Sequence, residues 1–301
     1  MNEVLRTPDE RFEGLPDWPY VPRYLDVEGA RMHYVDEGPR EGEVMLCLHG
    51  EPTWGYLYRK LIPVFTGAGL RAVAPDWIGF GRSDKYARRR DYSYEKHVRS
   101  LEHFVRSLDL RGITLIVQDW GGLIGLPWAT ENPERVARLV ILNTALPTGD
   151  VKPGAGFRLW RAFALWAPVL PIGAIMRAAL VAPVSPAVIR AYQAPFPSGR
   201  FKAGARAFPA LVPLGPDDPF AGRNRRAREA LGGWEKPTLI RFGRRDPVLG
   251  RVGPHFLKMV KALHGQPMGW VADAGHFVQE DKGEDVARDV VAFVRAHPSP
   301  R

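Results

Sequence analysis

Cysteine and long apolar runs are what this 301-residue chain has least of. Its one cysteine, Cys47, lies in the apolar run Val44–Leu48, which excludes a disulfide framework within one chain and predicts a buried, inert thiol. In the most apolar region the longest charge-free run, Ala162–Met176, has 15 residues and two prolines, so it is too short to span a bilayer. The first ten residues lack the apolar core of a secretory signal peptide. We therefore expect a cytoplasmic protein with no membrane partner.

Lysine is also scarce: 33 arginines and nine lysines make up the 42 basic residues behind the net charge of +9. The densest basic clusters, residues 88–90 and 223–226, lie in segments typical of loops, without the interleaved aromatic side chains on which bases stack. No histidine, cysteine and carboxylate spacing resembles a metal site, and no glycine-rich turn matches a phosphate-binding pattern. We expect no nucleic acid, no metal and no cofactor.

Strand-like and helix-like runs alternate along most of the chain, a pattern typical of a mostly parallel sheet flanked by helices. The predicted strands cover residues 32–35, 44–48, 72–74, 114–118, 136–142, 238–242 and 267–271. The predicted helices cover residues 56–65, 94–108, 122–131, 253–263 and 284–297. The predicted fold class is therefore α/β.

The alternation stops between residues 146 and 220, where prolines and helix-like apolar patches replace strand patterns. Strand patterning then returns, so an all-helical insertion into one sheet explains the chain better than a separate helical domain. We predict a core formed by residues 1–146 and 221–301 and a helical cap formed by residues 147–220. Because ligands bind at the carboxyl ends of parallel strands, an insertion that leaves that edge is expected to form a lid.

One strand end carries a carboxylate into a sharp turn. The β-branched run that ends at Gln118 is followed by Asp119, Trp120 and the pair Gly121-Gly122, and then by a helix-compatible segment. This is the pattern of a nucleophile elbow, which lifts one side chain above the sheet edge. A carboxylate nucleophile attacks carbon to form an ester, so Asp119 indicates alkyl transfer rather than acyl transfer from a serine.

Three further motifs stand at predicted strand ends. The turn His49–Trp54 follows the strand 44–48 and offers backbone N–H groups for an oxyanion. Asp246 follows the strand 238–242, and His276 follows the strand 267–271. The order nucleophile, acid, histidine is that of the α/β-hydrolase fold. Each motif alone is weak, but four motifs in this order at four strand ends predict an active site.

With these motifs in place, the chain resembles the haloalkane dehalogenases of the α/β-hydrolase superfamily, from residues 6–9 nearly to the C-terminus. The resemblance is carried by residues 49–54, 75–84, 117–122, 194–197 and 272–279. The chain is similar to the branch of the family whose acid follows the later strand, because Asn143 occupies the position after the earlier one. That leaves Asp246 as the predicted acid.

The resemblance implies a two-step reaction on a halogenated alkane and water, with release of halide. Asp119 displaces the halide and forms an alkyl ester, His276 activates the water that hydrolyses it, and Asp246 orients the imidazole. The backbone N–H groups of Glu51 and Trp120 are the expected oxyanion hole.

The resemblance also implies two indole donors for the departing halide and an apolar pocket around the substrate. Trp120 and Trp160 are the expected donors, with Trp166 as second choice, although Trp166 fits core packing better. The expected pocket residues are Phe157, Phe208, Pro209, Leu123, Val248 and Leu249. We expect a monomer or weak oligomer.

Three alternatives use the same fold. An epoxide hydrolase shares the triad but usually has two cap tyrosines that protonate the ring oxygen, and residues 146–220 contain only Tyr192. A haloacid dehalogenase needs arginines near the nucleophile, for which Arg158 and Arg161 are candidates. A non-enzymatic binding protein is disfavoured because all three catalytic residue types are present.

Overall fold

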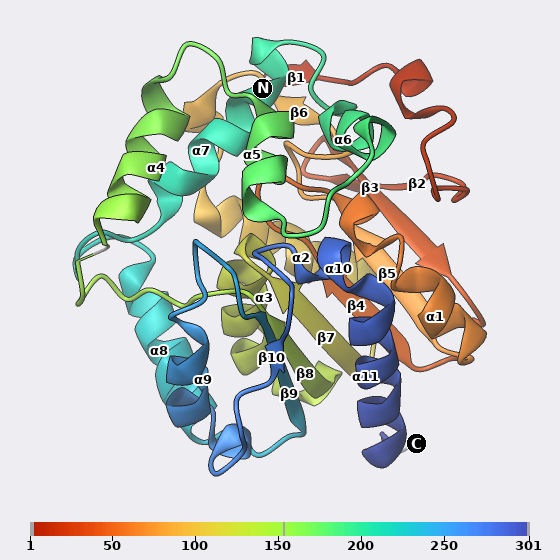
Figure 1. Ribbon diagram of the computed structural model, residues 1–301, viewed down its shortest axis with the longest axis vertical. Coiled ribbons are helices and arrows are strands. Elements are labelled where there is room, and N and C mark those ends of the chain that lie inside the picture. The colour runs from red at the N-terminus through yellow and green to blue at the C-terminus, as the bar shows by residue number, and fades with distance from the viewer. Residues whose placement is uncertain (1–2, 153, 300–301) are drawn as a thin grey trace.

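The computed structural model describes residues 3–152 and 154–299, and an eight-stranded sheet forms its centre (Figure 1). The strand order is β10-β9-β8-β7-β4-β5-β3-β2, parallel except where β3 pairs with β2 and β5. The bounds are β2 Arg23–Val27, β3 Ala30–Glu37, β4 Val44–Leu48, β5 Arg71–Pro75, β7 Ile113–Gln118, β8 Val136–Leu142, β9 Thr238–Gly243 and β10 Trp270–Val271. Two short strands, β1 Val4–Leu5 and β6 Lys85–Tyr86, pair separately.

Burial on both faces explains the central strands. Every residue of β4 and of β7 is buried, which is why these strands are continuous apolar runs rather than alternating ones. Flanking helices cover the sheet, and α1 packs on α11 while α3 packs on α2 and α8. These helices are α1 Ile62–Gly67, α2 Tyr94–Ser107, α3 Trp120–Glu131, α8 Ala221–Gly232, α9 Gly253–Met259, α10 Val278–Asp281 and α11 Gly283–Ala296.

Between β8 and α8 the described residues form helices and loops, with no strand, as the predicted insertion requires. The helices are α4 Ala155–Trp166, α5 Ile172–Ala179, α6 Pro186–Gln193 and α7 Ala203–Leu211, and they lie together at one end of the molecule (Figure 1). We call this group the cap. The division at residues 146/147 and 220/221 stays a prediction. Among the described residues, none of the helices has the length and apolarity needed to cross a membrane.

Several predictions about local structure differ from the structure; for example, the helix predicted to end at residue 263 is α9, which ends at Met259. The helix predicted over 56–65 is a 3₁₀ turn, Gly55–Tyr58, followed by α1, because Pro63 lacks an N–H and is tolerated only in a first helical turn. The strand predicted over 267–271 shrinks to β10, since Pro267 cannot donate to a ladder. The basic cluster 223–226 lies in α8 rather than a loop, and Arg223 forms ion pairs with two glutamates.

Candidate active site

The turn predicted to be a nucleophile elbow lies between the end of β7 and the start of α3. Asp119 has φ 49° and ψ −119°, a strained conformation for a residue with a side chain, and α3 begins at the next residue. A Cβ on Gly121 would lie 2.0 Å from the Leu48 carbonyl oxygen, and one on Gly122 would lie 2.0 Å from Thr144 Oγ1. Both positions therefore require glycine. The Thr144 hydroxyl also donates to the Asp119 carbonyl at 2.6 Å, which fixes the turn.

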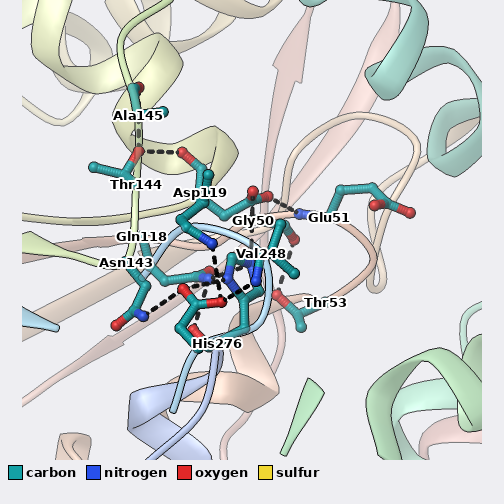
Figure 2. Close-up of polar contacts among 12 residues, drawn as sticks. Gly50, Glu51, Thr53, Gln118, Asp119, Asn143, Thr144, Ala145, Val248 and His276 are labelled. Carbon is teal, nitrogen blue, oxygen red and sulfur yellow. Dashed lines mark hydrogen bonds and ion pairs between the residues drawn. The ribbon is translucent and has the colours of Figure 1, made fainter. Parts of the chain in front are cut away.

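The three predicted triad residues meet at this elbow. His276 Nδ1 lies 3.1 Å from Asp246 Oδ2, and His276 Nε2 lies 3.7 Å from Asp119 Oδ2. The other nucleophile oxygen, Oδ1, accepts the Glu51 backbone N–H at 2.8 Å (Figure 2). Asp119 comes from β7, Asp246 follows β9 and His276 follows β10, so three strand ends supply the cluster.

The Asp246 carboxylate is fully engaged. Its Oδ1 accepts the backbone N–H groups of Val248 and Leu249 at 2.7 and 3.0 Å. Its Oδ2 accepts the Asn143 side-chain amide at 2.7 Å in addition to the imidazole. Burial favours the neutral acid, but the imidazole and these donors outweigh it and lower the pKa of Asp246. Asn143, at the alternative acid position, thus hydrogen-bonds the carboxylate predicted to be the acid.

His276 is almost fully buried between two carboxylates. Burial opposes its protonation, but the Asp246 charge, with Asp119, outweighs burial and raises the pKa of His276 to about 10. At neutral pH the free site therefore holds an imidazolium. Its backbone N–H donates to the Ala179 carbonyl of the cap at 2.9 Å, which positions the residue from the other side.

Gln118, one residue before the nucleophile, faces the reactive nitrogen of the histidine. Its Nε2 lies 3.2 Å from His276 Nε2, an arrangement that suits a neutral imidazole accepting at that atom. Turning the amide over would present Oε1, which has no partner among the described residues, to an imidazolium. As placed, Nε2 also donates to the His276 carbonyl at 3.3 Å, so Gln118 contacts both the ring and the backbone of His276, which the sequence did not reveal.

Glu51 contributes more than its predicted backbone N–H. Its carboxyl group is buried at the cavity wall, and Oε1 has no hydrogen-bond partner in the described part of the chain. Burial, reinforced by the negative charge of Asp119, raises the pKa of Glu51 well above its ordinary value. In the view of Figure 2 the carboxyl group points away from the nucleophile while the N–H faces it. Burial and the Asp119 charge therefore both favour the uncharged form of this carboxyl group.

Two of the tryptophans have free indole donors where halide binding was predicted. The indoles of Trp54, Trp77 and Trp128 donate within the protein. Those of Trp120 and Trp160 have no acceptor among residues 3–152 and 154–299. Trp120 is buried beside Asp119 and is not among the described lining residues of the cavity, whereas Trp160 of α4 lines it.

Trp166 corrects an expectation. Core packing was the preferred interpretation for this residue, yet it is 76% exposed, with the Arg89 guanidinium 5.7 Å from its ring centre. It follows Trp160 by six residues on α4, so it points to the solvent side when Trp160 faces the cavity. It is therefore neither a core residue nor placed to bind the halide.

A cavity of about 870 Å³ lies between the nucleophile and the cap. Of the predicted pocket residues, Phe157 and Val248 line it. The other four are not among the described lining residues: Phe208 and Pro209 are buried in α7, Leu123 is buried in α3, and Leu249 contributes a backbone N–H to Asp246. Phe208 lies one layer behind the wall, with its ring 4.4 Å from that of Trp120.

Cap residues supply a wall that sequence reasoning missed. Ile175, Ala178 and Ala179 line the cavity from one face of α5. Their spacing of three and four residues marks a common helical face and was the available signal.

Comparison with known proteins agrees with this geometry. The model of the alpha/beta hydrolase fold family matches residues 43–283. Haloalkane dehalogenases from Mycolicibacterium paratuberculosis and Mycobacterium marinum are 51% and 48% identical, in each case over 97% of this chain and 99% of the relative. A solved haloalkane dehalogenase from Paraglaciecola agarilytica, described as tetrameric, is 41% identical, with a TM-score of 0.91 over 96% of this chain and 98% of that one. The chain belongs to the haloalkane dehalogenase family.

Membership of the haloalkane dehalogenase family confirms three predictions: the family, the α/β-hydrolase fold and the class of hydrolase acting on carbon–halogen bonds. The roles of individual residues stay predictions. So does the expected monomer or weak oligomer, since the tetramer is a property of the Paraglaciecola protein.

Proposed function

We propose that this protein hydrolyses 1-haloalkanes to primary alcohol and halide with Asp119 as the nucleophile. The observation that carries the proposal is the division of labour between the two Asp119 oxygens. Oδ1 accepts the Glu51 N–H at 2.8 Å, whereas Oδ2 lies 3.7 Å from His276 and accepts no comparable bond among the described residues. In the first step Oδ2 attacks the carbon, the carbon–halogen bond breaks, and the halide leaves with its electron pair.

The second step, hydrolysis of the ester, depends on Asp119 Oδ1, the oxygen that does not attack the substrate. Oδ1 becomes the carbonyl oxygen of the ester, already bound by the Glu51 N–H, with the first N–H of α3, that of Trp120, as the second donor. Water attacks the Asp119 carbonyl carbon while His276 takes its proton. The tetrahedral intermediate then collapses, His276 returns the proton to the alkoxide, and alcohol leaves.

The charge on Asp119 also controls when His276 acts as a base. Before the reaction, two carboxylates stabilise the imidazolium. Alkylation removes the Asp119 charge, so the pKa of His276 falls and its proton is released more readily. Asp246 remains to orient the ring and to stabilise the imidazolium that forms when water is deprotonated.

Halide release depends on the two free indoles. Charge on the halogen grows only as its bond breaks, so donors aimed at it stabilise the transition state more than the substrate. The indole N–H groups of Trp120 and Trp160 suit this role because their bodies are apolar. Bromide is expected to quench tryptophan fluorescence in the parent protein. Trp160→Phe should weaken this binding, while Trp166→Phe, as a matched control outside the cavity, should leave it unchanged.

The epoxide hydrolase alternative is disfavoured by the state of the cap tyrosine. An epoxide opens to an alkoxide that needs a proton, whereas a halide needs none. The Tyr192 hydroxyl is buried, donates to Glu280 Oε2 at 2.6 Å and is absent from the described cavity wall.

The haloacid alternative is disfavoured by the placement of the cap arginines. The Arg161 side chain donates to the Pro209 carbonyl at 3.1 Å, and neither Arg158 nor Arg161 is among the described lining residues. Arg251 does line the cavity, so a haloacid belongs among the test substrates.

One experiment separates these functions. The purified protein is incubated with 1-bromobutane, 1,2-dibromoethane, styrene oxide and 2-bromopropionate, and halide, alcohol, diol and hydroxy acid are measured. We expect bromide and alcohol in equal amounts from the bromoalkanes, and a loss of about a thousandfold or more in freshly prepared Asp119→Asn.

His276→Phe should release one bromide per protein and gain the mass of the alkyl group, because the ester forms but is not hydrolysed. Diol without halide, or turnover with no covalent intermediate in this variant, would contradict the proposal.

A further inference from the structure

The outer face of α4 presents an apolar surface to solvent. Leu159 and Trp166 are 75% and 76% exposed, Phe163 lies between them at 39%, and Val169 follows the helix at 65%. The first three are spaced by four and three residues, which places them on one side of the helix. We call these four residues the α4 stripe. Single exposed apolar residues are ordinary, but a contiguous row marks an interaction site.

The opposite side of α4 faces the cavity and the rest of the cap. Phe157 and Trp160 line the cavity, and Ala164 is fully buried against the rest of the cap. The α4 stripe is therefore not the core-facing side of an amphipathic helix. Figure 1 shows α4 at the outer edge of the cap, where solvent is free to reach this side.

Basic residues flank the α4 stripe, most of them at its Trp166 end. Arg89 donates to the Leu165 carbonyl at 2.8 Å and lies over the Trp166 ring, with Arg88 and Arg90 exposed on either side of it. Arg206 donates to carbonyls at the end of the same helix, and Arg158 is exposed on α4.

Acidic residues do not balance this charge. Residues 147–220 contain eight lysines and arginines and three aspartates, so the cap carries more than half of the net charge of +9. Of those aspartates, Asp150 lies 3.5 Å from Arg225, and Asp218 accepts backbone N–H groups of its own turn.

A second copy of the chain fits this surface poorly. A helix of 12 residues is about 18 Å long and roughly 10 Å wide. Its contact area lies well below the roughly 800 Å² per partner that stable dimers bury. Parallel packing of two α4 stripes would also bring two basic clusters into contact.

We propose that the α4 stripe and Arg88–Arg90 dock the cap on the surface of a bilayer that contains anionic phospholipid. The apolar side chains enter the interface, while the arginines bind phosphate headgroups, so burial and charge act in the same direction. Such a protein lies on the membrane and does not span it, in agreement with the helix lengths. This revises the expectation of no membrane partner.

Docking would bring the cavity wall to the place where an apolar substrate accumulates. Phe157 and Trp160 stand on the same helix as the α4 stripe, and haloalkanes partition into lipid. This consequence rests on the proposed function. The docking itself does not, and it is tested without turnover.

The test is cosedimentation with vesicles of phosphatidylcholine alone or with about 30 mol% phosphatidylglycerol. We expect binding to the anionic vesicles to be at least roughly tenfold tighter and to weaken with salt, because exposed charges are screened. The double variant Leu159→Glu with Val169→Glu should lower the affinity at least about tenfold. Val21→Glu, at a 71% exposed valine outside the cap, should not. Arg88→Gln with Arg90→Gln should remove the preference for anionic lipid.

Equal binding of parent and stripe variant, or no binding to either vesicle, would overturn the proposal. So would sedimentation velocity without lipid that shows an oligomer lost in the stripe variant, since a second copy would then be the occupant. Circular dichroism and bromide release from dissolved 1-bromobutane show that each variant is folded, and we expect both to be unchanged. If no variant or parent protein released bromide, the proposed function would fail while the vesicle result kept its meaning.

Discussion

At the residue scale, one hydrogen bond makes the two oxygens of Asp119 different. The Glu51 N–H holds Oδ1, so Oδ2 is the oxygen free to attack carbon, and the oxygen already held becomes the ester carbonyl. The oxyanion donor is therefore in place before any negative charge develops on that oxygen, which is the preorganisation that makes such donors effective.

The Glu51 side chain gives a prediction at the same scale. Burial and the Asp119 charge raise its pKa well above the ordinary value, which favours the uncharged carboxyl group. Glu51→Gln preserves the uncharged state, the shape and the backbone N–H, so kcat for 1-bromobutane is expected to stay within about threefold of the parent value.

A matched control is Glu280→Gln, another buried glutamate. Its carboxylate binds Arg59 through both oxygens at 2.6 and 2.7 Å, and hydrogen bonds from Arg59 help lower its pKa despite burial. This variant is expected to lower Tm strongly, because it leaves a buried guanidinium without its charge partner. A loss of activity in Glu51→Gln of thirtyfold or so would mean that an ionised Glu51 takes part in the reaction.

At the element scale, the short helix α10 connects the cap to the loop between β10 and α10, which carries His276. Asp281 accepts the backbone N–H of Gly275 at 2.7 Å and those of Val181 and Ala182 in the cap. His276, which follows Gly275, donates its own backbone N–H to the Ala179 carbonyl. A Cβ on Gly275 would lie 2.3 Å from that oxygen, so glycine is required for the close approach. Cap position and imidazole position are thus set by one group of hydrogen bonds.

The variant Asp281→Ala tests whether these hydrogen bonds position both the cap and His276. The variant leaves three partly buried N–H groups without their acceptor, each worth about 1 kcal/mol or more. We expect the free energy of unfolding to fall by roughly 2–4 kcal/mol and kcat by about tenfold, with a shifted pH profile because His276 loses its support. Asp285→Ala is the control, since Asp285 is exposed and pairs only with Arg288 on its own helix. An unchanged pH profile in folded Asp281→Ala would reduce Asp281 to a purely structural residue.

At the same scale, the central strands could be predicted from the sequence, whereas the arrangement of the cap helices could not. The bounds of β4, β7 and β8 agree with prediction to within one residue, because strands buried on both faces are continuous apolar runs. The arrangement of cap helices was not predictable, since it depends on contacts between helices that no local pattern records. Trp166 is the exception: six residues beyond Trp160 is about 240° around a helix, so geometry alone placed the two on different sides.

At the scale of the whole molecule, two buried basic side chains, Lys85 and His276, make opposite contributions to the pH dependence of the free energy of unfolding. Burial, opposed by Asp76 and Asp84, lowers the pKa of Lys85 to about 7, and its ammonium donates to the Gly81 and Ser83 carbonyls. The pKa of His276 is instead raised to about 10. Between about pH 7 and 10 the folded state therefore holds a proton on His276 that the unfolded chain lacks, and lacks one on Lys85 that the unfolded chain holds.

These two differences have opposite signs. The His276 contribution to stability is complete below the unfolded histidine pKa and is lost as pH rises toward 10. The Lys85 contribution grows over the same range, because stability rises with pH wherever the unfolded state binds more protons. Each proton corresponds to a slope of at most about 1.4 kcal/mol per pH unit. Between about pH 7 and 9.5 the contributions of these two groups largely cancel, so neither is visible in the parent protein by itself.

Removing one group should reveal the other. Relative to the parent protein, the slope of the unfolding free energy against pH should become more positive in His276→Phe and more negative in Lys85→Met, whatever the absolute stability of each variant. Urea unfolding at several pH values measures these slopes, and the double variant should return to the slope of the parent protein. A parent protein and a His276→Phe variant with the same slope would show that the folded site does not hold an imidazolium, and that Asp119 and Asp246 do not outweigh its burial.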